Sequence, residues 1–136
     1  MEFKYMKTSW IFPGQASQKI GMGKDLYDKT KIGKKYYKTA NEILGVDIQS
    51  ISFNGPEEVL KKTKYTQPAI FIVSAIIGHA MIEKGYTPDI VAGHSLGEYS
   101  ALVVSGAFDF STGLELVKLR AESMQNAGKV NRGTMA

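Results

Sequence analysis

The hydrophobic and polar positions of the chain alternate between short apolar runs and longer segments with helical spacing. Two runs rich in β-branched residues, 8–14 and 88–93, end at glycine and predict buried strands. Residues 15–25 read as a loop, and helical patterns predict helices over residues 36–44, 54–63, 68–84, 96–107 and 109–128. Because strands alternate with helices, the predicted fold class is α/β, with a parallel sheet covered by helices.

Residues with special backbone preferences mark the expected ends of these helices. Gly45 and Gly128 stand where helical patterns stop, which is typical of a C-terminal cap. Pro56 can begin the short helix, because the N–H groups of the first turn have no acceptor within the helix and the N–H that proline lacks is not needed there. Asp109 or Ser111 can cap the start of the last helix with a side-chain oxygen.

Size and composition limit the class of protein. The chain has 136 residues, of which 43% are hydrophobic and 22% charged, as expected for one globular domain. It has no cysteine, which excludes disulfides, thiolate metal ligands and cysteine nucleophiles and fits a cytoplasmic location. No signal peptide is visible, and the apolar run 69–77 is too short to span a bilayer. We therefore expect no membrane association, no metal and, without a recognisable motif, no nucleic-acid partner.

The chain has a formal net charge of +4, because its 17 lysine and arginine residues outnumber its 13 acidic residues. The lysines concentrate in residues 28–39 and 60–64. A solvated helix face explains such runs, and a landing surface for an acidic partner is the alternative. The pattern leaves both interpretations open.

The junction between the second strand and the next helix contains a Gly-x-Ser-x-Gly sequence centred on Ser95. A strand that ends in this sequence and turns directly into a helix is typical of a nucleophile elbow. The turn is sharp, so the residues on either side of the serine have to be small, and Gly93 and Gly97 meet this requirement. Ser95 is raised above the sheet at a helix N-terminus, which favours negative charge, and the amide of Leu96 is placed to donate to an oxyanion. Such short matches also occur by chance, but the strand before and the helix after support a nucleophile.

Ser95 needs a base, because a free hydroxyl is a poor nucleophile. In elbow enzymes a histidine later in the chain has this role, yet the only histidines are His79 and His94. His94 adjoins Ser95, where neighbouring side chains point apart, and we favour a structural role in the turn. His79 lies in an apolar helix and is interpreted as a core residue. The absent base and the small number of strands lead us to expect part of a longer enzyme.

Arg120 has an unusual place on the last predicted helix. At 100° per residue the other charged side chains gather on one side: Glu115, Lys118 and Glu122. Arg120 comes out roughly opposite, on the apolar face. A cation there needs a partner, which can be a structural ion pair, water reached by snorkelling, or a carboxylate on a ligand. The pattern does not choose between a structural and a ligand-binding role.

Four segments in this order, FPGQASQ, TQPAI, AGHSLGEYSAL and LVKLRAESMQ, resemble the malonyl-CoA:acyl carrier protein transacylase family. The similarity runs from about Ser9 to the last residue, and acyltransferase domains of polyketide synthases share these motifs. The resemblance implies an acyltransferase of fatty-acid biosynthesis. It would move a malonyl group from coenzyme A, through a seryl ester, to the phosphopantetheine thiol of acyl carrier protein. The coenzyme A thioester would be a substrate, with no permanently bound cofactor.

The resemblance implies roles for the residues at the reacting carbonyl. Ser95 would be the nucleophile. The backbone N–H groups of Gln15 and Leu96 would form the oxyanion hole. One departure lies beside this loop, because the family usually has glycine where this chain has Ala16.

Further roles concern the substrate. Arg120 would hold the free carboxylate of the malonyl group, and Gln67 would line the site as a support. His94 and Glu98 match the family pattern around the serine, and the resemblance defines no role for them.

The resemblance also implies an architecture. Residues 1–132 would form the N-terminal part of an α/β-hydrolase-like large subdomain, and residues 133–136 would begin a ferredoxin-like subdomain. Family members are roughly twice as long and carry the histidine base in their C-terminal part, so we expect an incomplete parallel sheet with covering helices. Two rival hypotheses remain. The elbow alone permits a serine esterase or thioesterase, and the chain by itself can be a catalytically inactive fragment.

Overall fold

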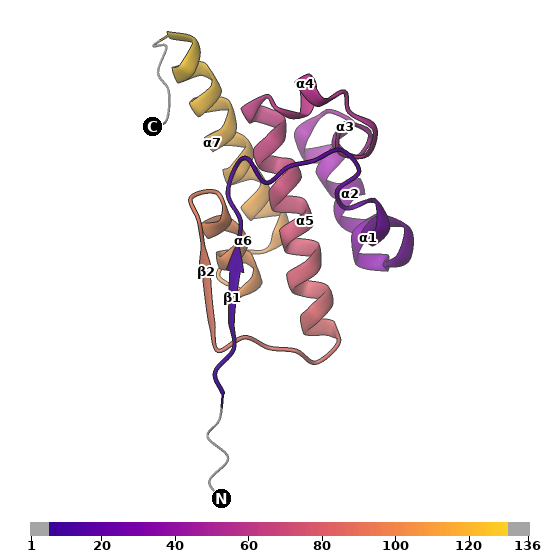
Figure 1. Cartoon of the computed structure of the whole chain (residues 1–136), viewed down its shortest axis with the longest axis vertical. Helices are drawn as coiled ribbons and strands as arrows, with labels where there is room; N and C mark the ends of the chain where they lie inside the picture. The colour runs from indigo at the N-terminus through magenta and orange to yellow at the C-terminus, as the bar shows by residue number, and fades with distance from the viewer. Residues whose placement is uncertain (1–5, 131–136) are drawn as a thin grey trace, which may run out of the picture.

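The structure, a computed structural model, describes residues 6–130, which form two strands and seven helices (Figure 1). In chain order these are β1 (Ser9–Phe12), α1 (Lys24–Lys29), α2 (Lys31–Leu44), α3 (Ile48–Asn54), α4 (Glu57–Leu60), α5 (Thr63–Glu83), β2 (Ile90–Gly93), α6 (Gly97–Val104) and α7 (Phe110–Val130). The predicted α/β class is confirmed. The predicted start of a second subdomain at residues 133–136 lies outside the described residues.

The two strands pair in parallel, as predicted. Ser9 lies opposite Ile90, and Phe12 lies opposite Gly93. The carboxyl ends of both strands therefore meet at the same edge of the sheet. The loop after β1 and the turn after β2 are brought together at that edge.

The prediction that both strands are buried is wrong for the described chain, because only one face of the sheet is covered. On that face Phe12 packs with Ala101 and Val104 of α6. On the other face Ile11 is 77% exposed and Ile90 is 55% exposed. The apolar composition of the strands suggested two covered faces, whereas the described residues supply helices for one.

Helix α5 runs through the middle of the molecule and packs against α6 and α7 as well as against α1 to α4, and α2 also packs directly against α7 (Figure 1). By length and composition it is the one described helix that could cross a membrane, yet most of its apolar window is buried in this fold. Phe71, Ile72 and Ile76 are fully buried and form much of the core.

The predicted start of this helix at Pro68 is wrong, since α5 begins at Thr63 and Pro68 lies inside it. Proline removes the N–H that would bond to the carbonyl of Lys64, so Pro68 is a local weakness rather than a start. Tertiary contacts hold the first turn. The Thr66 hydroxyl donates to the carbonyl of Leu60, and the Lys64 N–H donates to Gln125 of α7 at 3.1 Å.

Two short helices, α1 and α3, were not predicted. Helix α1 has six residues, none of them buried, and starts within the segment predicted as a loop. Helix α3 is capped by Asp47, whose carboxylate accepts a hydrogen bond from the Ser50 N–H at 2.9 Å. Elements of this length have too few turns to produce a clear helical period.

Several predicted helix ends can be compared with the structure. Gly45 is left-handed at the end of α2, and Pro56 stands at the N-cap of α4, as predicted. Asp109 caps α7 by accepting from the Thr112 N–H at 2.7 Å. The prediction that Gly128 ends this helix is wrong, because α7 continues to Val130. The predicted start of α2 at residue 36 is also wrong, since the helix begins five residues earlier, at Lys31, where the Thr30 side chain caps it by accepting from the Gly33 N–H.

Candidate active site

Ser95 occupies a tight turn between β2 and α6, with its backbone in the left-handed region at φ 53°. This conformation is unfavourable for a residue with a Cβ and persists only when the surroundings impose it. The neighbouring glycines explain how. A Cβ on Gly93 would lie 2.0 Å from the carbonyl carbon of Gly97, and a Cβ on Gly97 would lie 2.2 Å from the carbonyl oxygen of Phe12. The close approach of β1, β2 and α6 therefore requires glycine at both positions and leaves the Ser95 side chain exposed.

The guanidinium of Arg120 lies directly beside the serine. One of its nitrogens donates to the Ser95 hydroxyl at 2.8 Å, and another donates to the side-chain oxygen of Gln67 at 2.6 Å. The ring of Tyr99 lies 5.8 Å from the guanidinium carbon. No carboxylate among residues 6–130 forms an ion pair with Arg120. A half-buried cation with only neutral partners has the electrostatic properties of an anion-binding group.

Gln67 connects Arg120 to the loop after β1. It is fully buried in α5, and its amide nitrogen donates to the side-chain oxygen of Gln15 at 3.2 Å and contacts the sulfur of Met124 at 3.3 Å. Gln15 in turn donates to the hydroxyl of Thr63 at 3.2 Å. This network fixes the orientation of the guanidinium on the side away from Ser95. It also connects the loop after β1 with α5 and α7.

Two backbone N–H groups near the serine have no partner among the described residues. Neither the N–H of Gln15 nor that of Leu96 donates a hydrogen bond to another described group. The loop that holds Gln15 lies against the elbow, since a Cβ on Gly14 would come within 2.7 Å of His94. Ala16, at φ 83°, has a strained left-handed backbone in the same loop. Donors of this kind suit an oxygen that gains negative charge during a reaction.

Neither histidine hydrogen-bonds to the serine hydroxyl. His94 uses its backbone in the turn, donating to Phe12 at 3.0 Å and accepting from Gly97 at 2.9 Å. His79 bonds through Nδ1 to the hydroxyl of Tyr36 at 2.6 Å, on the side of α5 that faces α2. Among the described residues, Arg120 is the only side chain that hydrogen-bonds to Ser95. The serine therefore has a polar partner but no general base in this part of the chain.

The structure brings together most of the residues singled out from the sequence, namely Gln15, Gln67, Ser95, Leu96 and Arg120. Glu98 is exposed in the first turn of α6, and its side chain makes no hydrogen bond to this network. Sequence reasoning missed Met124 and Thr63. Met124 lies one helical turn after Arg120, and that spacing was the available signal for it.

Comparisons with known proteins identify close relatives. A family model described as acyl transferase domain matches residues 9–136. Malonyl CoA-acyl carrier protein transacylase from Synechocystis is 52% identical over 122 residues, which are 90% of this chain and 41% of the relative. A crystal structure of the malonyl-CoA:ACP transacylase of that organism superposes with a TM-score of 0.86, covering 90% of this chain and 41% of that one.

A second solved structure, a type II polyketide synthase acyl-carrier protein in complex with its malonyl-transacylase, is 43% identical, with a TM-score of 0.84. It covers 90% of this chain and 40% of the solved chain. The present chain thus spans about two-fifths of the length of the relatives it matches.

Proposed function

The chain belongs to the acyl transferase domain family, since the family model covers nearly all of it, and on this premise we propose that it supplies the nucleophile and the carboxylate-binding side of a malonyl-CoA:acyl carrier protein transacylase. One observation carries the proposal. Arg120, a cation without a carboxylate partner in the described chain, is hydrogen-bonded to the hydroxyl of Ser95. A substrate placed at this serine meets a positive charge within the same site.

The first half-reaction forms a seryl ester. The oxygen of Ser95 attacks the thioester carbonyl of malonyl-CoA, and the carbonyl oxygen becomes an oxyanion. The unpartnered N–H groups of Gln15 and Leu96 stabilise this charge. When the carbonyl re-forms, the carbon–sulfur bond breaks, and coenzyme A leaves as a thiol with the proton that Ser95 gave up.

The second half-reaction reverses these bonds on another thiol. The phosphopantetheine thiol of acyl carrier protein attacks the seryl ester, the carbon–oxygen bond breaks, and Ser95 recovers its proton. Acyl carrier protein is the proposed partner, in line with the structure of a malonyl-transacylase relative bound to one. The chemistry uses no metal and no resident cofactor, and the malonyl group is conserved throughout.

Arg120 selects the acyl group in this proposal. The free carboxylate of a malonyl group is one methylene away from the carbonyl under attack, so a guanidinium next to Ser95 is at a suitable reach for it. The planar guanidinium grips both carboxylate oxygens and exchanges its bond to Ser95 for the ion pair. An acetyl group has no charge for Arg120, and the cation would stay without an ionic partner.

The proton of Ser95 needs a base that the described residues do not provide at hydrogen-bonding distance. We assign this role to the histidine that the family resemblance implies, in the part of the family's length that this chain does not span. The same reasoning makes residues 1–132 the N-terminal part of an α/β-hydrolase-like subdomain and residues 133–136 the start of a ferredoxin-like one. The parallel pair β1–β2 with its serine elbow supports that assignment, and the lack of cysteine supports a cytoplasmic location.

The lysine run at residues 60–64 is the better placed of the two for an acidic carrier protein. It leads into α5, whose first residue, Thr63, bonds to Gln15 of the site network. Lys61 and Lys62 are exposed there. Replacing both by glutamate should weaken carrier binding strongly at low salt and little at high salt. If the unchanged chain and the double variant bound the carrier equally well at low salt, this run would be only a solvated helix face.

The test of the proposed function separates transfer from hydrolysis. The chain is incubated with malonyl-CoA and acyl carrier protein that bears phosphopantetheine, and malonyl-carrier and free malonate are quantified by mass spectrometry. Malonyl-carrier as the main product supports a transacylase, whereas malonate as the main product favours the esterase or thioesterase hypothesis. A folded chain that yields neither product is inactive by itself.

A further inference from the structure

The first turn of α5 has no side-chain cap of its own. An N-cap residue normally accepts a hydrogen bond from this turn through a side-chain oxygen, but Lys62 stands at the N-cap and makes no such bond. Its carbonyl accepts from the N–H groups of Tyr65 at 2.8 Å and Thr66 at 2.9 Å. The N–H of Lys64 is therefore left for a partner outside the helix. Because Pro68 has no N–H for the Lys64 carbonyl, this turn also has fewer internal bonds than a regular one.

Gln125 of α7 supplies the missing acceptor. Its side-chain oxygen accepts from the Lys64 N–H at 3.1 Å, across 61 positions of the sequence. The N–H groups of a first turn carry partial positive charge, so an oxygen is favoured at this place. A glutamine of one helix thus caps the start of another.

This bond lies where α7 is no longer covered by the rest of the protein. Ala121 is the last buried residue of the helix, and none of residues 122–130 is buried. Within residues 6–130, Gln125 is the last residue of α7 that hydrogen-bonds to another helix. In a regular α-helix the carbonyl of Arg120 accepts from the N–H of Met124. Fraying that passed Gln125 and reached Met124 would therefore loosen the turn that carries Arg120.

Two contacts fix the height of α7 against the first turn of α5. Gln67 accepts from Arg120 at 2.6 Å, and Gln125 accepts from Lys64 at 3.1 Å. Gln67 follows Lys64 in α5, whereas Arg120 precedes Gln125 in α7, so the two helices run antiparallel here. Five residues of α-helix rise about 7.5 Å. Contacts this far apart oppose sliding and tilting of α7, which a single contact does not.

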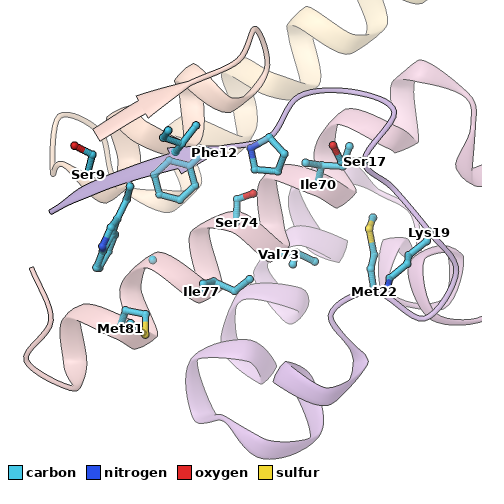
Figure 2. A pocket seen from close by; sticks show the side chains of 14 residues that line it. Ser9, Phe12, Ser17, Lys19, Met22, Ile70, Val73, Ser74, Ile77 and Met81 are labelled. Atoms are coloured by element: carbon cyan, nitrogen blue, oxygen red, sulfur yellow. The ribbon is translucent and has the colours of Figure 1, made fainter. Parts of the chain in front are cut away.

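Another face of α5 takes no part in holding α7. This face lines an apolar groove of about 520 Å³ together with β1, and α7 contributes none of the lining residues. Figure 2 shows Ser74 and Ile77 of α5 on the groove side, with Phe12 of β1 across from them. The position of α7 near Ser95 therefore depends on the face of α5 that carries Lys64 and Gln67.

We propose that Gln125 is a positioning residue for Arg120. By capping the first turn of α5, it keeps α7 at the height at which the guanidinium reaches both the Gln67 oxygen and the Ser95 hydroxyl. Gln125 does not hydrogen-bond to Ser95, so it acts through the helix. Its consequence for acyl choice rests on the proposed function, in which Arg120 binds the malonyl carboxylate, whereas the positioning itself does not.

NMR of the guanidinium tests the positioning without any substrate. Arg120 and Arg132 are the two arginines of the chain, so their resonances can be assigned directly. The two Nη groups of Arg120 donate to different acceptors and should give separate resonances, because these bonds slow rotation of the guanidinium. Gln125→Met keeps the length of the side chain and removes the acceptor. We expect hydrogen exchange at the Lys64 N–H to become about fivefold faster and the Arg120 Nη resonances to merge.

Two further variants separate the cap from a general effect of substitution. Gln125→Glu keeps an acceptor oxygen, and its negative charge suits a helix N-terminus, so it should restore slow exchange and separate resonances. Gln49→Met is the matched control, since Gln49 lies in α3 and its side chain makes no hydrogen bond to another described residue. If circular dichroism shows that Gln125→Met is unfolded, Gln125→Ala and Gln49→Ala replace the pair, because alanine is the best helix former.

The intact mass of the chain links the position of Arg120 to acyl choice. After incubation with malonyl-CoA or acetyl-CoA, we expect Gln125→Met to lower the ratio of malonyl to acetyl adduct on Ser95 about fivefold. Gln125→Glu should restore this ratio. A loss of stability alone would lower both adducts alike and leave the ratio unchanged.

Several results would overturn the proposal. They are a single Arg120 Nη resonance in the unchanged chain, equal spectra of Gln125→Met and Gln49→Met, and a Gln125→Glu variant that behaves like Gln125→Met. Faster exchange at Lys64 with unchanged Arg120 resonances would reduce Gln125 to a local cap and also contradict it. The expected spectra together with no adduct on the unchanged chain would leave this inference standing and count against the proposed function.

Discussion

The guanidinium of Arg120 donates a hydrogen bond to the hydroxyl of Ser95 at 2.8 Å, which joins the middle of α7 to the elbow after β2. The two residues are 25 positions apart, and the contact depends on the packing of α7 against α5 and α6. Because the other partners of Arg120 are neutral, a carboxylate that enters the site can replace Ser95 as its acceptor. Under the proposed function, this exchange would couple recognition of an anionic acyl group to release of the serine oxygen.

Gln67→Glu tests whether Arg120 is reserved for the substrate. The change places a carboxylate where the amide oxygen now accepts from Arg120 at 2.6 Å, so the cation gains an internal partner. We expect the affinity for malonyl-CoA, measured by titration calorimetry, to fall about tenfold or more, with little change for acetyl-CoA. Gln67→Met, which adds no charge, is the control for lost hydrogen bonds. An unchanged malonyl-CoA affinity in Gln67→Glu would exclude an ionic role for Arg120.

Ala16→Gly should stabilise the protein. Ala16 has a positive φ of 83°, a region in which an L-residue is strained and glycine is not. Glycine also raises the conformational entropy of the unfolded chain, which offsets part of the relieved strain. We therefore expect a net gain of about 0.5–1 kcal/mol in the free energy of unfolding. Urea denaturation measures it. Ala107→Gly, at an exposed position without positive φ, should lose stability, and the same sign for both variants would argue against strain at Ala16.

Gly97→Ala should disrupt the elbow. The added Cβ would lie 2.2 Å from the backbone oxygen of Phe12, which cannot move without separating β1 from α6. We expect a loss of about 2–4 kcal/mol in the free energy of unfolding. Gly128→Ala is the matched exchange, since its Cβ meets nothing within 4 Å in α7. That variant should gain up to about 1 kcal/mol from helix propensity. Equal effects of the two exchanges would contradict the packing of the elbow.

Acid pH should weaken the cap of α7. The backbone N–H of Thr112 donates to the carboxylate of Asp109 and holds its pKa below the ordinary value of 3.8. A lowered folded pKa contributes stability above the unfolded value, and this contribution is lost as the pH falls through the folded one. Asp109→Asn keeps a capping oxygen that does not titrate. The difference in unfolding free energy between the parent and this variant should therefore shrink below pH 3.8. A difference independent of pH would refute the carboxylate cap.

Local features of the site could be predicted from the sequence, because short-range geometry determines them. The strand, the serine and the helix of the elbow follow one another directly, so five residues and their flanks were enough to predict the turn. Likewise, the helical period placed Arg120 away from Glu115 and Glu122 on α7. The period could not identify its neutral partners, since these come from other elements.

Long-range features were beyond the pattern. Gln67 lies 52 residues from Gln15 and 57 from Met124, and only the family resemblance suggested that the first two share a site. Tertiary contacts at Lys64 extended α5 beyond Pro68, and a threonine cap extended α2. The burial of the strands was overestimated because their apolar composition predicts that both faces of the sheet are buried. In the described residues, helices cover only one face.

The most direct test of the central claim is the intact mass of the chain after incubation with malonyl-CoA, with acetyl-CoA and with Ser95→Ala as controls. Because the histidine base is assigned outside this chain, we expect a slowly formed malonyl adduct that is absent from Ser95→Ala, weak with acetyl-CoA, and greatly reduced in Arg120→Ala. An adduct that persists in Ser95→Ala, or that forms equally well from both thioesters, would contradict a malonyl-selective serine site.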